Sequence, residues 1–247
     1  MRFHFVRIAM SARGSVRCLL AGLFFAAAIA AGSLPAVAGP RPLSLQAGGG
    51  TCCLALRQPC NERAVITLLE PGQYHRTPWR NGGGVTVDIA VVTDKDGDVW
   101  RFGRTPIVAA GPFSDYRGFD RVQALVAGSG LVLATPDGEI DVRQPFRPVR
   151  FAGETPIVSR LEAGPVEVVN LIGHRAKVRI DLRVLDEDRS LRLGPGTHIV
   201  YNPLGESTLD VDGARHVLAG DHALRLETTV ATVLAGHGGC LLVASIT

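Results

Sequence analysis

Apolar and polar residues alternate through most of the chain after residue 63. Every second position is apolar from Val85 to Val91 and again from Val178 to Val184. A period of two places apolar side chains on one face of a β-strand, whereas a helix repeats every 3.6 residues. No long helical pattern competes with it, so the sequence predicts an all-β protein.

Turn signals separate the expected strands at short intervals. Asp96-Gly97, Asp137-Gly138 and Asp212-Gly213 each supply residues suited to the tight turns of hairpins. Many short strands at even spacing indicate a sandwich, a jelly roll or a pair of barrels. The pattern predicts strands at 66–69, 85–93, 99–109, 122–127, 131–135, 139–142, 157–161, 166–172, 177–185, 197–202, 208–211, 223–227, 231–234 and 240–245.

The first 63 residues follow a different pattern. A basic lead at Met1–Arg17 precedes an apolar run at Leu19–Ala31 and an Ala-x-Ala site at Ala36–Ala38. This order is typical of a signal peptide, and the run is short of the about 20 residues that span a bilayer. We expect residues 1–38 to be a signal peptide, or else a leader that results from a start codon assigned too far upstream. We expect residues 39–63 to be a disordered linker and residues 64–247 to be the folded domain.

Two locations stay open because the start site is open. The protein is periplasmic or exported if the leader is real, and cytoplasmic if the start codon is assigned too far upstream. Cys52, Cys53, Cys60 and Cys240 would survive cleavage, and an even number of cysteines permits disulfides in an exported chain. Their spacing lacks the paired Cys-x-x-Cys of a structural zinc site. Cys240 lies in an apolar run and is expected to be a buried core residue.

Composition and charge narrow the classes of function. The chain has 247 residues, 46% of them hydrophobic and 20% charged, which excludes a disordered chain. Seven of the 26 Lys and Arg residues, but only one of the 23 Asp and Glu residues, precede Ala64. The remaining 19 bases and 22 acids give the body a charge of −3, unfavourable for binding a phosphate backbone. We therefore expect no nucleic-acid partner, and no membrane association after leader cleavage.

Glycine-rich turns are followed by apolar hairpins in both halves of the body, at Gly128–Leu131 and at Leu218–Leu224. This arrangement of turns resembles that of cupins, in which alternate side chains of a small jelly-roll barrel point into its cup-shaped interior. Four stretches are more distinctive: Arg76–Thr86 (RTPWRNGGGVT), Gly111–Arg121 (GPFSDYRGFDR), Phe151–Glu154 (FAGE) and Gly164–Leu171 (GPVEVVNL).

Together these four stretches are similar to the HutD/Ves family of cupin-like proteins, which is linked to bacterial histidine utilisation and stress response. The resemblance covers about Val65 to Ser245. It implies a bicupin, that is two small jelly-roll-type β-barrels in one chain, with a pocket for a small metabolite. It implies no settled enzyme activity.

The chain departs from the family pattern at three places. Arg117 stands where the family has proline, Glu154 where it usually has aspartate, and Val168–Asn170 where it has Asp-Phe-Asn. A cation gained at Arg117 and a carboxylate lost at Val168 would favour a more anionic ligand if both positions face inward. The family is also cytoplasmic without a leader, so residues 1–63 are a further departure.

The first distinctive stretch supplies candidate ligand-binding residues. Trp79 could stack on a planar ligand, Arg80 bind a carboxylate and Asn81 hydrogen-bond an amide, while Gly82 and Gly83 let the ligand approach the backbone. The alternative is a wide glycine turn in which Trp79 plugs one end of a barrel.

The second stretch supplies further candidates. On one strand, Ser114, Tyr116 and Asp120 would share a face, opposite Arg117 and Arg121, unless Gly118 introduces a bulge. Asp120 or Arg121 could instead form a structural ion pair with a neighbouring strand. The family resemblance adds three more ligand-binding candidates, Phe151, Glu154 and Asn170.

The sequence contains no motif typical of metal or cofactor binding. The His-x-His of metal-binding cupins is missing, and the histidines of the second half are too far apart along the chain to share a strand. No dinucleotide loop or nucleophile elbow occurs. We expect no metal, no cofactor and no catalytic residue.

Three functions remain open. The first is a metal-independent protein that binds a small anionic or amide-bearing metabolite, and so senses or buffers an intermediate of histidine utilisation. The second is a cupin-type isomerase or hydrolase that uses an acid–base pair from Asp120, Glu154 or His222. The third is an exported structural protein whose sheet edges assemble with a partner. A homodimer is compatible with each.

Overall fold

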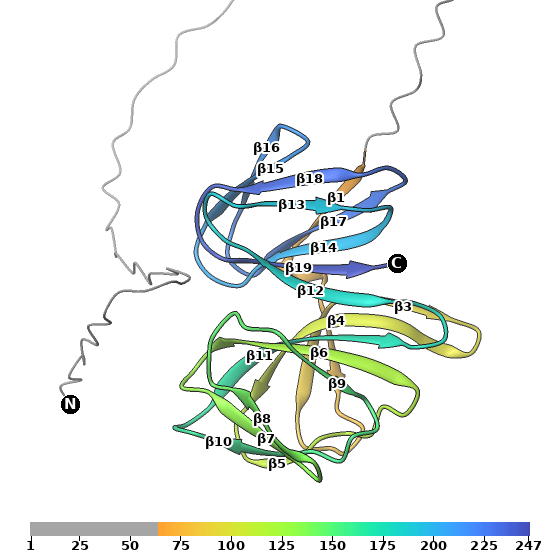
Figure 1. Cartoon of the computed structure of the whole chain (residues 1–247), viewed down its shortest axis with the longest axis vertical. Helices are drawn as coiled ribbons and strands as arrows, with labels where there is room; N and C mark the ends of the chain where they lie inside the picture. Colours follow the sequence, from red (N-terminus) through yellow and green to blue (C-terminus); the bar gives the residue numbers. More distant parts are fainter. Residues whose placement is uncertain (1–63) are drawn as a thin grey trace, which may run out of the picture. The chain divides into compact units, whose positions relative to one another are not determined.

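The computed structural model describes residues 64–247, so the expectations for 1–38 and 39–63 lie outside the described part. This part consists of β-strands and one short 3₁₀ turn, η1, which confirms the all-β prediction (Figure 1). The elements are β1 (Val65–Leu69), η1 (Pro71–Gln73), β2 (His75–Pro78), β3 (Val85–Asp94), β4 (Gly97–Ile107), β5 (Gly111–Pro112), β6 (Phe119–Ala127), β7 (Leu131–Thr135), β8 (Gly138–Val142), β9 (Val149–Ala152), β10 (Val158–Leu161), β11 (Val166–His174), β12 (Ile180–Leu185), β13 (Ser190–Leu193), β14 (Gly196–Asn202), β15 (Ser207–Val211), β16 (Ala214–Leu218), β17 (His222–Thr228), β18 (Thr232–Gly236) and β19 (Leu241–Ile246).

The strands form two pairs of sheets. In the first half, a six-stranded sheet of order β2-β3-β4-β11-β6-β9 faces a four-stranded sheet of order β5-β10-β7-β8. In the second half, a five-stranded sheet of order β1-β17-β14-β19-β12 faces a four-stranded sheet of order β13-β18-β15-β16. We call the six-stranded sheet the cavity sheet, because one of its faces carries the candidate site described below.

Three apolar clusters hold these sheets together. One fills the space between the two sheets of the first half and includes Leu125, Leu131 and Val168. A second fills the second half. The third joins the halves, because Phe102 of the cavity sheet packs edge-on against Tyr201 of the five-stranded sheet, with ring centroids 6.0 Å apart. Each large sheet is therefore covered on both faces.

The first strand crosses between the halves. β1 pairs along its length with β17 in the second half, whereas β2, which begins six residues after β1 ends, pairs with β3 in the first half. The chain makes this crossing through η1, where Pro71 begins the turn.

All the strands expected from alternation are present, with ends shifted by at most a few residues. The alternation did not predict β2, β5, β9, β13 and β16, which have two to five residues each. A strand this short offers too few positions for a period of two to stand out.

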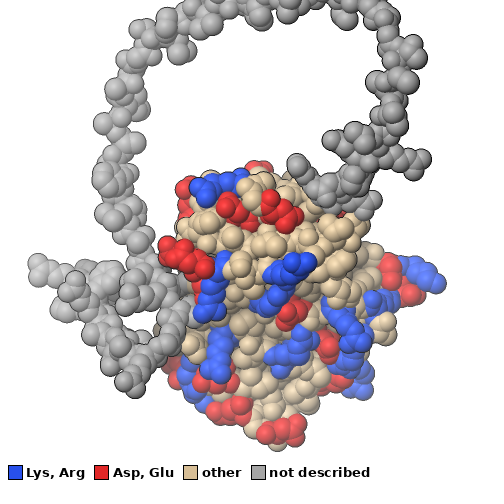
Figure 2. Space-filling view, turned by 45° about the horizontal axis from the view of Figure 1, so that its top comes forward, with Lys and Arg blue, Asp and Glu red and all other residues tan. Residues whose placement is uncertain are grey.

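The surface of the described part carries charges of both signs. On the face drawn in Figure 2, basic and acidic side chains lie interspersed among uncharged ones rather than in one continuous basic surface. Within residues 64–247 no helix has the length and apolar character needed to cross a membrane.

Candidate functional site

A cavity of about 40 Å³ opens on the inner face of the cavity sheet. This volume holds a few water molecules or a carboxylate-sized group. Strands β3, β4, β6 and β11 supply its floor, and the segments beside Trp79 and Phe113 supply its wall. The lining residues are Trp79, Thr86, Asp88, Arg101, Gly103, Thr105, Ile107, Phe113, Ser114, Tyr116, Arg121, Asn170 and Ile172.

Strand alternation explains why these residues share the cavity. On β4 the odd-numbered residues from Arg101 to Ile107 face the cavity, whereas Phe102 faces the other half of the protein. On β11 the even-numbered Asn170 and Ile172 face the cavity. Successive side chains of a strand point to opposite faces, so each strand contributes to the cavity and to the joining core at once.

Arg121 is the most unusual residue of the site. Its side chain is only 6% exposed, and none of the ion pairs found in the described part involves it. One Nη donates a hydrogen bond to Asn170 Oδ1 at 3.1 Å, while Nε, also buried, has no partner. The rings of Phe113 and Phe151 each lie 5.0 Å from the guanidinium carbon. Burial lowers the pKa of Arg121 to about 10, so the side chain stays cationic at neutral pH.

The cavity's other charges neutralise each other. Asp88 is almost fully buried and accepts hydrogen bonds from Arg101 at 3.1 and 2.5 Å and from the Thr77 hydroxyl at 2.5 Å. With Asp88 paired to Arg101, the positive charge of Arg121 is left without an acid, and the cavity has a net positive charge. Cations in such surroundings attract anions.

Trp79 lies between the cavity and the apolar core of the first half. Its indole lines the cavity and also packs against the apolar core of the first half. The Nε1–H donates to the Thr86 hydroxyl at 3.1 Å, which lies 3.0 Å from the Thr105 hydroxyl. The ring therefore has a fixed orientation, with one part in the cavity wall.

The residues after Trp79 do not line the cavity. Arg80 is exposed and its guanidinium lies 4.5 Å from the centre of the Tyr116 ring, at the rim. The Asn81 side chain accepts a hydrogen bond from the Gly83 N–H and donates to the Pro112 carbonyl at 2.7 Å. Gly82 takes a positive φ of 73° in this turn. The expected amide-binding role of Asn81 is thus replaced by a structural one in its own turn.

The face assignment for Ser114–Arg121 was wrong in one respect. Ser114, Tyr116 and Arg121 line the cavity together, whereas Asp120 does not. Strand β6 begins only at Phe119, and a turn closed by the Phe119 N–H and the Tyr116 carbonyl precedes it. Because the residues before Phe119 are not in a strand, their parity does not continue into β6.

Asp120 and Glu154 form ion pairs away from the cavity. Arg175 binds Asp120 at 2.7 Å and both oxygens of Glu154 at 3.0 and 3.1 Å. The hydrogen bonds from Arg175 lower the pKa of Glu154 to about 2. The contacts of Asp120 are therefore those of a structural ion pair, which was the alternative to a ligand-binding role.

His222 lies in the other half, on β17, where its ring Nδ1 is 2.9 Å from the Gly220 carbonyl. Asp120 and Glu154 thus share Arg175 as a partner, His222 lies apart from them, and none of the three lines the cavity. His198 is buried, hydrogen-bonded to Ser245 and the Gly194 carbonyl, and its pKa is lowered by burial. Within residues 64–247 no cluster of three or more His, Cys, Asp or Glu residues is arranged to hold a metal.

The two departures at Arg117 and Val168 do not act as expected. The Arg117 side chain is 82% exposed and pairs with Asp115 at 3.5 Å, outside the cavity. Val168 does face inward, where it is fully buried in the core of the first half. Phe151 also belongs to this core and contacts the site through Arg121 and through the ring of Phe113, whose centroid lies 6.5 Å from its own.

Sequence reasoning missed Asp88 and Arg101. Asp88 occupies a polar position of the alternation from Val85 to Val91, so the pattern predicts an exposed side chain there. Arg101 lies between the apolar Trp100 and Phe102, and a charged residue in such a run could have been recognised as a candidate for a buried ion pair.

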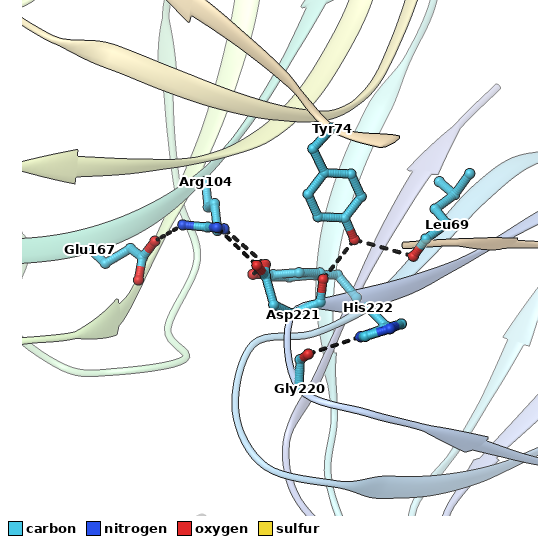
Figure 3. Close-up of polar contacts among 8 residues, drawn as sticks. Leu69, Tyr74, Arg104, Glu167, Gly220, Asp221 and His222 are labelled. Carbon is cyan, nitrogen blue, oxygen red and sulfur yellow. Dashed lines mark hydrogen bonds and ion pairs between the residues drawn. The ribbon is translucent and has the colours of Figure 1, made fainter. Parts of the chain in front are cut away.

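A second polar cluster joins the halves on the opposite face of the cavity sheet (Figure 3). Arg104 donates two hydrogen bonds of 2.8 Å to Asp221 and one of 3.0 Å to Glu167. Asp221 also accepts from the Tyr201 hydroxyl, and its carbonyl accepts from the Tyr74 hydroxyl. Burial, and then the Asp221 charge, raises the pKa of Tyr201 above its usual range. The cluster therefore ties β4 to the turn before β17.

Comparison with known proteins identifies relatives of the whole body. The HutD family model matches residues 72–243. An uncharacterised 21.2 kDa protein encoded in the hutC 3′ region of Pseudomonas putida is 29% identical over 138 residues, which cover 55% of this chain and 73% of that protein.

Solved structures agree with this match. HutD from Pseudomonas fluorescens is 25% identical with a TM-score of 0.64, and a conserved protein of unknown function from Pseudomonas aeruginosa is 21% identical with a TM-score of 0.66. Each comparison covers 74% of this chain and 98% of the other. The Ylba protein of E. coli, at 8% identity and a TM-score of 0.51, shares the fold over 76% of this chain and 95% of its own. The chain therefore belongs to the HutD family and has its cupin-like, all-β fold.

Proposed function

We propose that this protein binds a small anionic metabolite in the cavity, with Arg121 as the anion-binding group and without a metal. The single observation that carries the proposal is a buried guanidinium in the cavity wall with no acid beside it. A buried cation without a counter-charge costs folding free energy, and an anionic ligand would supply the missing partner.

The other lining groups support a carboxylate as the bound group. An arginine fork matches the two oxygens of a carboxylate, and Ser114 and Asn170 add polar atoms beside it. No imidazole lines the cavity, so its donor set favours an organic anion over a transition metal. The indole of Trp79 offers a flat apolar surface to the rest of the ligand.

Membership of the HutD family supports an intermediate of histidine utilisation as the metabolite. We propose sensing or buffering as the role, and the position of Asp120, Glu154 and His222 outside the lining of the cavity supports binding over acid–base catalysis there. The structure of the P. fluorescens relative is described for a formate condition, and formate is the smallest carboxylate probe for this cavity.

We further propose that the two pairs of sheets are two jelly-roll cups, the bicupin arrangement. Only the first cup would bind ligand, since leucine and valine side chains occupy the interior of the second.

Thermal unfolding tests the proposed function. The protein is melted with millimolar formate, urocanate, N-formylglutamate or histidine, and at least one is expected to raise the melting temperature. A ligand at 100 times its Kd adds about 2.7 kcal/mol to the free energy of unfolding. In Arg121→Met this rise is expected to disappear, because the guanidinium is gone.

Arg117→Met is the matched control, since it removes an exposed arginine that does not line the cavity. It is expected to keep the full rise. A melting temperature that none of the four compounds changes, or an equal rise in Arg121→Met, would contradict the proposal.

A further inference from the structure

Strand β1 forms one edge of the five-stranded sheet. Within residues 64–247 it pairs with β17 along one side, and no described strand pairs with its other side. The pairing with β17 runs from Val65 to Leu69 without a bulge. The open side of an edge strand carries backbone N–H and C=O groups that can hydrogen-bond to a further strand. β1 therefore has a regular edge to which one more strand can be added.

The composition of β1 differs from that of the other edge strands of the described sheets. Its sequence is Val-Ile-Thr-Leu-Leu, with no charged residue and no proline. Charges and prolines at sheet edges oppose the addition of a strand, because a charge would lose its hydration and a proline has no N–H to donate. Each of the seven other edge strands has such a residue: β2 (Arg76, Pro78), β5 (Pro112), β8 (Glu139, Asp141), β9 (Arg150), β12 (Asp181, Arg183), β13 (Arg192) and β16 (Arg215). Among these eight edges, β1 alone lacks this protection.

The side chains of β1 expose apolar surface on both faces of the sheet. Val65 is 62% exposed and Leu68 is 46% exposed. Because successive residues of a strand point to opposite faces, these two side chains lie on different faces. A strand added to β1 would cover part of both, and burial of apolar area favours such an addition.

The sequence of β1 fits a second copy of itself. A twofold axis through Thr67 would relate two antiparallel copies of the strand. Val65 would then lie opposite Leu69 of the second copy, and the two residues would share a face. Ile66 would likewise lie opposite Leu68 of the second copy. Every opposing pair is apolar or threonine, so no like charges meet, and twofold symmetry is the commonest symmetry of protein dimers.

We propose that the protein forms a homodimer through β1, in which the two five-stranded sheets join into one continuous antiparallel sheet. The ligand cavity belongs to the six-stranded sheet of the first half, so this inference does not depend on the proposed function. A contact of five residues on each side is expected to bury less than the roughly 1,200 Å² of a standard interface. The dimer is therefore expected to dissociate on dilution.

Sedimentation velocity of the full chain tests the proposal. Over roughly 1 to 500 µM, the unmodified protein is expected to change from monomer to dimer, as a small interface predicts. In Val65→Lys the dimer is expected to weaken at least about tenfold, because pairing would bury an ammonium group against a leucine. In the monomer the introduced side chain lies opposite Glu227 on β17, so the strand keeps its place in the sheet.

Val217→Lys is the matched control. Val217 is 60% exposed and also lies on an edge strand, β16, so the substitution has the same chemistry at an edge that is not expected to pair. Its dimerisation is expected to equal that of the unmodified protein.

Thr67→Glu provides a second test if Val65→Lys fails to fold. In the monomer the new carboxylate would lie opposite Arg225 on β17, whereas in the dimer two carboxylates would face each other across the twofold axis. This variant is likewise expected to stay monomeric where the unmodified protein is a dimer.

Three results would overturn the proposal. The first is an unmodified chain that stays monomeric over the whole range, in which case β1 is covered by another part of the chain or binds a different protein. The second is a dimer that neither Val65→Lys nor Thr67→Glu weakens. The third is an equal loss of dimer in Val65→Lys and Val217→Lys, which would show that added charge acts without regard to the edge.

Discussion

A buried charge without a partner is the clearest functional signal at the scale of single residues. Arg121 is surrounded by aromatic rings and one amide, and these compensate only part of the lost hydration. An apolar side chain at this position would lose no comparable hydration free energy on burial. Under the proposed function, an anionic ligand would supply the compensation that the protein itself does not.

The pKa of Arg121 predicts how binding depends on pH. With a value lowered to about 10 by burial, the guanidinium is protonated in both neutral and mildly alkaline solution. Formate affinity is expected to stay level from pH 6 to pH 9 and to decline only above about pH 10, as the cation loses its proton. Titration calorimetry across this range measures it. A decline centred near pH 7 would indicate that a different group, with a pKa near neutrality, controls binding.

Some of the residues that the sequence predicts to bind a ligand come together in the structure, and others do not. Trp79, Ser114, Tyr116, Arg121 and Asn170 were all predicted ligand-binding residues and all line the cavity. Those that do not line it have contacts that residue type alone does not reveal: Asn81 is held in its own turn, and Asp120 and Glu154 are bound by Arg175 from a distant segment. Such long-range pairings depend on the sheet register, which the sequence pattern does not specify.

At the scale of elements, the close approach of β3 and β4 sets the shape of the cavity. Gly103 lies on β4 facing inward, and a Cβ atom there would lie 2.6 Å from the Val87 carbonyl oxygen and 2.9 Å from a Thr86 methyl group. Any larger residue would push the strands apart and displace Asp88 with them.

Gly103→Ala is therefore expected to lower the free energy of unfolding by about 1–3 kcal/mol, as overpacking does in well-packed interiors. Urea denaturation measures this change. Gly72→Ala is the control, because a Cβ at Gly72 meets no atom within 4 Å. Equal stability of the two variants would show that β3 and β4 can separate without cost.

Strand prediction succeeded where a strand contains a long run of alternating or continuously apolar residues. β3 and β11 have long runs of alternating or continuously apolar residues and were predicted nearly end to end. β5 has two residues and contains Pro112, so neither an alternation of apolar residues nor a high β-propensity identifies it as a strand. Its position follows from pairing with β10, which is a tertiary contact.

At the scale of the whole molecule, one polar cluster connects the halves beneath the cavity. Arg104 and Asp221 are 27% and 28% exposed, so water screens their ion pair only partly. Asp221→Asn removes the charge but keeps the shape. It is expected to cost about 1–2 kcal/mol of unfolding free energy, in the range of charge-assisted hydrogen bonds.

Chemical denaturation of Asp221→Asn, compared with Glu139→Gln, tests this expectation. Glu139 pairs with Arg160 in a contact that is more than half exposed, and losing such a pair costs at most about 1 kcal/mol. If both substitutions have the same small effect, the cluster does not hold the halves together.

The crossing of β1 has a consequence for how the protein is made. β1 leaves the ribosome before any other described strand, yet its neighbour β17 is synthesised more than 150 residues later. Until then Ile66 and Leu69 have no sheet to join, and the early strand must wait unpaired. Cutting the gene between the two sheet pairs would accordingly leave β1 on the N-terminal product without its partner β17, and the C-terminal product would lack the edge strand of its large sheet.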